Sequence, residues 1–75
     1  MKVIVTGAAQ GIGRAIALKI AKDHQGAKLL LTDQHPDSLE SIASEVRALG
    51  ASAHIKPGDL TDPQFIVDLT SEISW

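Results

Sequence analysis

Three glycines stand where an apolar run over residues 2–6 gives way to a helix-like pattern: Gly7, Gly11 and Gly13. A glycine-rich turn lets the backbone approach an anion closely, since glycine has no side chain and adopts backbone angles that other residues avoid. The helix that follows directs free N–H groups and the positive end of its dipole toward that anion. This spacing predicts a pyrophosphate site, with a purely structural strand-to-helix turn as the alternative.

Two aspartates follow later apolar segments. Asp33 comes directly after residues 28–32 and lies 20 residues beyond Gly13. A carboxylate there can accept hydrogen bonds from ribose hydroxyls and would repel a 2′-phosphate. Asp59 follows a weaker segment and precedes Leu60. The alternatives are an ordinary strand-end aspartate for Asp33 and a loop aspartate that precedes or caps a helix for Asp59.

Few other residues could perform catalysis or bind a metal ion. The chain has no cysteine and no tyrosine, and its three histidines are 11 and 19 residues apart, which fits no local metal motif. Three serines alternate with apolar residues on an expected helix, and none follows a nucleophile-elbow pattern. We therefore expect no catalytic residue and no metal site. The histidines (His24, His35 and His54) should lie at the surface or in strands, and the serines (Ser38, Ser41 and Ser44) should face solvent.

The glycines and aspartates need a framework that brings them together. Apolar runs predict strands over residues 2–6 and 28–32, and a weaker pattern predicts a third over residues 51–56. The second run is apolar almost throughout, as in a parallel strand covered on both faces. No repeat, linker or low-complexity segment interrupts the chain, so we expect a single domain over residues 1–75.

The first helix is predicted between the first two strands. It begins around Gly11, and its apolar residues recur four apart at Ile12, Ile16 and Ile20, with Ala15 and Ala21 beside them. Gly26 supplies a stop after its end.

The second helix has the clearest amphipathic pattern. Asp37 or Ser38 can cap it, and Gly50 follows its end. Its apolar residues recur three and four apart: Leu39, Ile42, Ala43, Val46 and Leu49.

The third helix is predicted to run almost to Trp75. Residues 61–64 offer a cap, a proline in the first turn and, in Gln64, the glutamine of a capping box. Its apolar side would consist of Phe65, Ile66, Leu69 and Ile73.

Strands joined by helices of this length are parallel, with right-handed crossovers. We therefore predict an α/β fold: a partial Rossmann fold of pattern βαβαβα, in two or three layers, with strand order 3-2-1. The strand over residues 2–6 would keep a free edge and part of a bare sheet face. A second copy of the chain or the remainder of a larger domain is expected to cover them.

The octet Thr6–Gly13 resembles the Thr-Gly-x-x-x-Gly-Ile-Gly signature of the short-chain dehydrogenase/reductase family, and residues 14–17 are similar to that family as well. The resemblance implies a Rossmann-fold oxidoreductase that uses a nicotinamide cofactor. It also implies that Asp59 and Leu60 hold the adenine ring. The expected cofactor contacts are Gly7, Ala9, Gln10, Gly11, Ile12, Gly13, Asp33, Asp59 and Leu60.

The resemblance also bears on the cofactor and the reaction. Relatives that prefer NADP often carry a basic residue at the position of Gln10, so Gln10 agrees with Asp33 in favouring NAD. Lys56 and Arg14 stay open as cations that the fold could bring near the ribose. Family members transfer hydride between the cofactor and a secondary alcohol or ketone with a serine and a Tyr-x-x-x-Lys pair, which lie beyond this sequence. We therefore expect a cofactor-binding N-terminal segment that is inactive by itself.

Two other functions stay open. The chain could be a non-catalytic module that binds a nucleotide or associates with copies of itself through the edge of the strand over residues 2–6. It could also be a segment of another Rossmann-like enzyme, such as a methyltransferase, although the glycine spacing argues against this.

Size and charge limit the remaining classes. At 7.9 kDa, the chain should bury only about 60% of its unfolded surface, which favours a partner. The net charge is −2, but residues 1–32 carry +4 and residues 33–75 carry −6. We expect these charges to form solvated faces, with attraction between copies or steering of an anionic ligand as alternatives.

Composition excludes two kinds of partner and favours one compartment. There is no basic cluster with interleaved aromatic residues, so nucleic-acid binding is not expected. No apolar run approaches the ~20 residues of a membrane span. The lack of cysteine agrees with a reducing cytoplasm.

Overall fold

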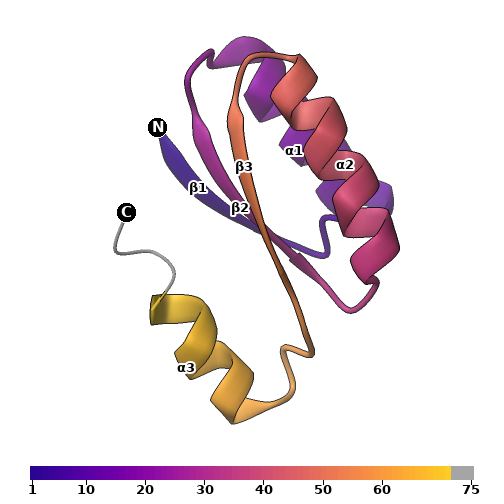
Figure 1. The fold of residues 1–75 in the computed structure, drawn as a ribbon, viewed down its shortest axis with the longest axis vertical. Helices are drawn as coiled ribbons and strands as arrows, with labels where there is room; N and C mark the ends of the chain where they lie inside the picture. The colour runs from indigo at the N-terminus through magenta and orange to yellow at the C-terminus, as the bar shows by residue number, and fades with distance from the viewer. Residues whose placement is uncertain (72–75) are drawn as a thin grey trace.

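The computed structural model describes residues 1–71, along which strands and helices alternate (Figure 1). The elements are β1 (Lys2–Thr6), α1 (Gly11–Asp23), β2 (Lys28–Asp33), α2 (Pro36–Ala48), β3 (Ser52–Pro57) and α3 (Pro63–Ser71). The strands of this part of the chain are parallel in the order β1-β2-β3, with Lys28 of β2 opposite Lys2 and Ser52. The predicted α/β partial Rossmann fold is confirmed.

Strand β2 lies at the centre of the sheet and is covered on both faces. Leu29, Leu30 and Leu31 are each at most 1% exposed, as the apolar run predicts. Thr32 is buried as well, and its hydroxyl donates to the carbonyl oxygen of Lys56 at 2.7 Å. This hydrogen bond satisfies a buried polar group and ties the end of β2 to the end of β3.

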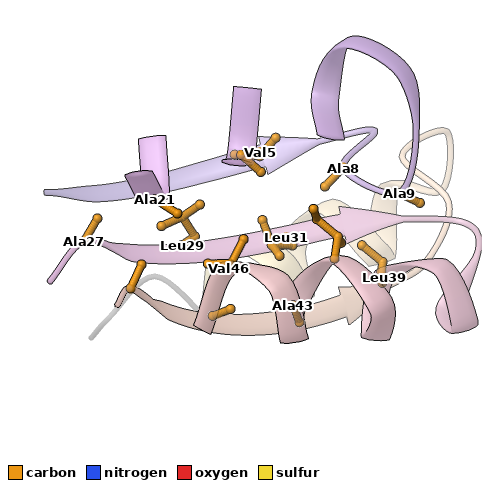
Figure 2. Packing of buried hydrophobic residues seen from close by; sticks show 14 residues of the cluster. Val5, Ala8, Ala9, Ala21, Ala27, Leu29, Leu31, Leu39, Ala43 and Val46 are labelled. Carbon is orange, nitrogen blue, oxygen red and sulfur yellow. The ribbon is translucent and has the colours of Figure 1, made fainter. Parts of the chain in front are cut away.

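Helices α1 and α2 cover one face of the sheet (Figure 1). The larger buried cluster lies here, where Leu29 and Leu31 of β2 meet Leu39, Ala43 and Val46 of α2 (Figure 2). The apolar face predicted for the second helix is therefore confirmed, except that Leu49 lies just beyond α2 and is 38% exposed.

Helix α3 lies on the other face, which makes three layers (Figure 1). Phe65 and Leu69 of α3 pack around Leu30 in a separate small cluster. Ile66, predicted for the same side of the helix, is 45% exposed. The prediction for Ile73, and for the extension toward Trp75, lies outside the described residues.

Only the C-terminal part of the apolar side predicted for helix α1 faces the core. Ala21 is buried and Ile20 packs partly buried against the main cluster, whereas Ala15 is exposed. Ile12 and Ile16 are 79% and 48% exposed. A Cβ on Gly13 would lie 2.1 Å from the carbonyl oxygen of Gly7, so α1 approaches the end of β1 closely. Small side chains suit so close an approach, and the buried residues of α1 follow Gly13 at intervals of four: Ala17 and Ala21.

The start of α2 differs from the prediction. His35 is the N-cap residue and Pro36 occupies the first turn, so neither Asp37 nor Ser38 caps the helix. Proline suits the first helical position because its φ is already helical and its missing N–H would have no intrahelical partner there.

The start of α3 is capped by an aspartate. The Oδ1 of Asp62 accepts the backbone N–H of Gln64 at 3.0 Å. The Gln64 side chain donates instead to Asp68 at 3.0 Å, one turn along the helix. The predicted capping-box role of Gln64 is therefore wrong, because Asp62 caps the helix and Gln64 lies only two residues after it, one short of the capping-box spacing.

One edge of the sheet is open in the described part of the chain, where β1 pairs with β2 alone. Ile4 of β1 is 39% exposed on the sheet. The accessible surface is 4415 Å², the area of about 4,400 Å² expected for a globular protein of this mass. No helix within residues 1–71 is both long and apolar enough to span a membrane.

Candidate nucleotide-binding site

The turn between β1 and α1 has a backbone shape that glycine adopts far more readily than other residues. Gly7 and Gly11 both have φ of 62°, in the left-handed region that favours glycine. Gln10, the N-cap residue of α1, has an extended backbone, and its side chain makes no capping hydrogen bond. That side chain therefore does not occupy the first-turn N–H groups, which with the helix dipole suit an anion.

Asp33 connects three segments at the end of β2. Its Oδ2 accepts the backbone N–H of Ala9 at 3.1 Å, and its Oδ1 accepts that of His35 at 3.2 Å. The Asp33 carbonyl oxygen accepts the N–H of Gly58 at 3.0 Å. The side chain is 12% exposed. A carboxylate has about four acceptor sites, so these bonds leave capacity for ligand hydroxyls.

Asp59 lies in the loop that follows β3. Its Oδ1 accepts the backbone N–H of Thr61 at 2.9 Å and the Thr61 hydroxyl at 2.8 Å. The backbone hydrogen bond is the main reason why the pKa of Asp59 lies below the ordinary value of 3.8, so the side chain is charged at neutral pH. Gln34, which follows β2, donates to the same oxygen at 3.5 Å. Leu60 beside it is 40% exposed.

A hollow of about 370 Å³ brings these loops together at the carboxyl ends of the strands. Five of the predicted contacts line it: Gly7, Gln10, Asp33, Asp59 and Leu60. The other four do not. Ala9 is 7% exposed behind the turn, Gly13 packs against Gly7, and Gly11 and Ile12 face solvent at the start of α1.

Four further lining residues were not predicted: Gln34, His35, Gly58 and Thr61. Each is adjacent to Asp33 or Asp59 or separated from it by one residue. Their position beside the two aspartates, in the loops after β2 and β3, could therefore have identified them as residues of the site.

Acidic and polar side chains line the hollow together with Leu60 and two glycines. His35 Nδ1 lies 3.8 Å from Asp33 Oδ1. The two cations left open by the sequence, Lys56 and Arg14, do not line it, and Arg14 forms an ion pair with Glu45 of α2. The arrangement can therefore bind a polar ligand through backbone N–H groups and carboxylates.

The remaining candidate side chains lie at the surface, as predicted. The three histidines and the three serines of the second helix are all exposed. Within the described residues there is no group of three or more histidine, aspartate or glutamate side chains placed to hold a metal ion.

Comparison with known proteins places these features in context. A family model described as short chain dehydrogenase matches residues 1–74. A 2,3-dihydro-2,3-dihydroxybenzoate dehydrogenase of Bacillus subtilis is 41% identical over 69 residues, which cover 92% of this chain and 26% of that relative. The chain therefore spans about a quarter of the length of that curated relative.

Solved structures share the fold. An NADPH-dependent reductase involved in bacilysin biosynthesis superposes with a TM-score of 0.87 at 34% identity, covering 96% of this chain and 30% of that one. A metagenomic short-chain oxidoreductase in complex with NADP has a TM-score of 0.88 at 32% identity, covering 97% and 32%.

Proposed function

The chain belongs to the short-chain dehydrogenase family, and from that premise we propose that residues 1–75 form a segment that binds the adenosine and pyrophosphate of a nicotinamide cofactor. The observation that best supports this is the hollow that joins the glycine turn to Asp33 and Asp59. Ligands of open α/β sheets bind at the carboxyl ends of the strands.

In this proposal, different residues contact different parts of the cofactor. The turn from Gly7 to Gly13 faces the pyrophosphate with Gln10 and with the first-turn N–H groups of Gly11, Ile12 and Gly13. Ala9, whose own N–H donates to Asp33, holds the turn in shape behind them. The Asp33 carboxylate accepts hydrogen bonds from the adenosine ribose, and Asp59 and Leu60 lie against the adenine. A nicotinamide cofactor supplies hydride chemistry at its far end, away from these residues.

We further propose that the chain prefers NAD to NADP. Asp33 and Asp59 both line the hollow, and Gln10 adds no positive charge. A 2′-phosphate beside Asp33 would meet repulsion. The two related structures described above name NADPH and NADP, so the proposed preference rests on Asp33, Asp59 and Gln10 of this chain.

An NMR amide titration of the 75-residue chain with NAD and, separately, NADP tests this function. We expect shifts concentrated at residues 7–13 and at Asp33 and Asp59, with tighter binding of NAD.

Asp33→Asn should reduce the preference for NAD by about fivefold, the effect of one unit charge a few ångströms away in a solvated site. Asparagine keeps one oxygen that can accept the N–H of Ala9, so the glycine turn should hold its shape, while the hydrogen bond from the N–H of His35 is lost.

Asp23→Asn is the matched control. Asp23 lies at the other end of α1, paired with Lys19 at 2.8 Å, and its loss should leave the preference unchanged. Unchanged selectivity in Asp33→Asn would remove Asp33 from the ribose site. A chain that keeps a dispersed spectrum but responds to neither nucleotide would refute the function.

The activity of a whole protein is a further proposal. We propose hydride transfer between the cofactor and a secondary alcohol or ketone, in a reducing cytoplasm. The 75 residues contain no tyrosine, so the proton transfer of that reaction is assigned to residues outside them. The open edge of β1 is where the rest of such a domain, or a second copy, would pair.

A further inference from the structure

We propose that Phe65 of α3 is a positioning residue for the adenine end of the site, and that it acts through Gly58. The inference rests on the proposed function, because it concerns how the loop that carries Asp59 and Leu60 is held. Gly58, Asp59 and Leu60 line the hollow, whereas Phe65 lies behind them in the small cluster under α3. Sequence spacing assigns Phe65 only to the apolar side of a helix.

The ring of Phe65 lies directly against the backbone of Gly58. A Cβ at residue 58 would lie 2.7 Å from Cζ of the ring and still closer to Cε1 and Cδ1, nearer than real Cβ atoms come. Gly58 lacks the positive φ of Gly7 and Gly11, so its backbone conformation does not require glycine. The ring, and not the turn, therefore leaves no room for a side chain at residue 58.

The ring itself has little freedom to move. Phe65 is 8% exposed and packs with Leu69 around Leu30, which is 1% exposed at the centre of the sheet. Close-packed interiors transmit strain because their side chains have no empty space to enter. The ring is therefore a firm support for the backbone of Gly58.

The loop between β3 and α3 is tied at both ends, so its support also fixes the residues that it carries. The N–H of Gly58 donates to the carbonyl oxygen of Asp33 at 3.0 Å, and the N–H of Asp62 donates to that of Asp59 at 3.0 Å. Asp62 also caps α3. We infer that the place of the ring sets how far Asp59 and Leu60 lie from the Asp33 carboxylate.

The test compares two ligands of the 75-residue chain by NMR amide titration. NAD would contact both ends of the site, whereas inorganic pyrophosphate would contact the glycine turn alone. Phe65→Leu keeps an apolar side chain in the cluster but lacks the ring edge that contacts Gly58. We expect its Kd for NAD to rise about fivefold, the effect of losing one net hydrogen bond to the adenine. Its Kd for pyrophosphate should stay unchanged.

Gly58→Ala tests the same contact from the other side. Against the wild-type ring, the added methyl group should displace the loop and also raise the Kd for NAD about fivefold. In the double variant with Phe65→Leu, the shorter side chain leaves room for the methyl group. Gly58→Ala should therefore cost much less affinity there, which a double-mutant cycle measures. Losses that simply add would overturn the inference.

Leu69→Val is the matched control, because it removes a methylene group from the same cluster one turn farther along α3. It should speed amide exchange in α3 and leave the Kd for NAD unchanged. Three further results would overturn the inference and leave the proposed function standing: equal weakening of NAD binding by Leu69→Val and Phe65→Leu, equal weakening of pyrophosphate and NAD binding by Phe65→Leu, or wild-type NAD binding by folded Phe65→Leu. If neither ligand shifts the wild-type amides of residues 7–13, the proposed function fails, and the role of Phe65 fails with it.

Discussion

At the residue scale, Gly13 sets how closely α1 can approach the end of β1. An added Cβ would lie 2.1 Å from the carbonyl oxygen of Gly7 and 2.9 Å from that of Thr6. Alanine is ordinarily about 1 kcal/mol more favourable than glycine in a helix, but here its methyl group would push α1 off the strand. We expect Gly13→Ala to lower the free energy of unfolding by about 1–3 kcal/mol in urea denaturation.

Ala15→Gly is the control for that substitution, because Ala15 is exposed on the same helix. It should cost about 1 kcal/mol through helix propensity alone and leave nucleotide-induced shifts intact, whereas Gly13→Ala should weaken them. A Gly13→Ala chain as stable as the wild type would contradict the close contact between α1 and the glycine turn.

Asp59 should give the fold an acid-sensitive contribution. Its pKa is lowered in the folded state, chiefly by the backbone N–H of Thr61 and then by the Thr61 hydroxyl. Its stabilisation is therefore complete above the ordinary pKa of 3.8 and is lost as the pH falls through the lowered value. We expect the carboxyl carbon resonance of Asp59 to titrate below 3.8 and its midpoint to rise in Thr61→Val. A wild-type midpoint of 3.8 or higher would contradict this.

Residue types and spacing were enough to predict that the glycine turn, Asp33 and Asp59 would lie at one edge of the sheet, since parallel strands bring their carboxyl ends together. They were not enough to predict that Asp33 accepts the N–H of Ala9, 24 residues away. That contact depends on the turn geometry. The approach of His35 to Asp33 depends on the loop between β2 and α2.

At the element scale, α3 is the helix with the smallest core. Its buried contacts are Phe65 and Leu69 around Leu30, separate from the main cluster. Leu→Ala substitutions in cores cost about 2–5 kcal/mol. We expect that loss to exceed the stabilisation that so small a cluster gives α3. We expect Leu69→Ala to release α3, so that amides of residues 63–71 exchange rapidly with solvent in NMR while those of β2 and α2 stay protected.

Val67→Ala serves as the comparison for α3. Val67 lies on the same helix but is 60% exposed, so its truncation should leave amide exchange in α3 nearly unchanged. Loss of protection in β2 together with α3 after Leu69→Ala would instead mean that the sheet and α3 unfold as one unit.

The predicted strands agree with the observed ones to within one residue at each end, because apolar runs bounded by glycine, proline and charged residues leave little freedom. The helices show where the sequence was insufficient. Spacing alone, which placed Ala21 correctly, cannot distinguish Ile12 and Ile16 from Ala17 as the inner face of α1. The choice depends on the contact of Gly13 with the strand end, a tertiary constraint.

At the scale of the whole molecule, the open sheet edge at β1 lies close along the chain to exposed apolar side chains of α1. β1 has one partner strand in the described part of the chain, and Ile4 is 39% exposed. The positive charge of the first half is partly paired, through Arg14 with Glu45 and Lys19 with Asp23. We therefore expect apolar surface to contribute more than charge to any association between copies.

Replacing Ile12 and Ile16 with glutamine tests whether the apolar surface of α1 contributes to association between copies. Both side chains are largely exposed, so the double variant should change the free energy of unfolding by no more than about 0.5 kcal/mol, while association in sedimentation velocity decreases. Ile66→Gln on α3, where the side chain is 45% exposed, is the control on the other face of the sheet. A decrease confined to the α1 variant would place the contact between copies at α1. An equal decrease in both would contradict that location, and association unaffected by either would point to backbone pairing at the edge of β1, which does not depend on these side chains.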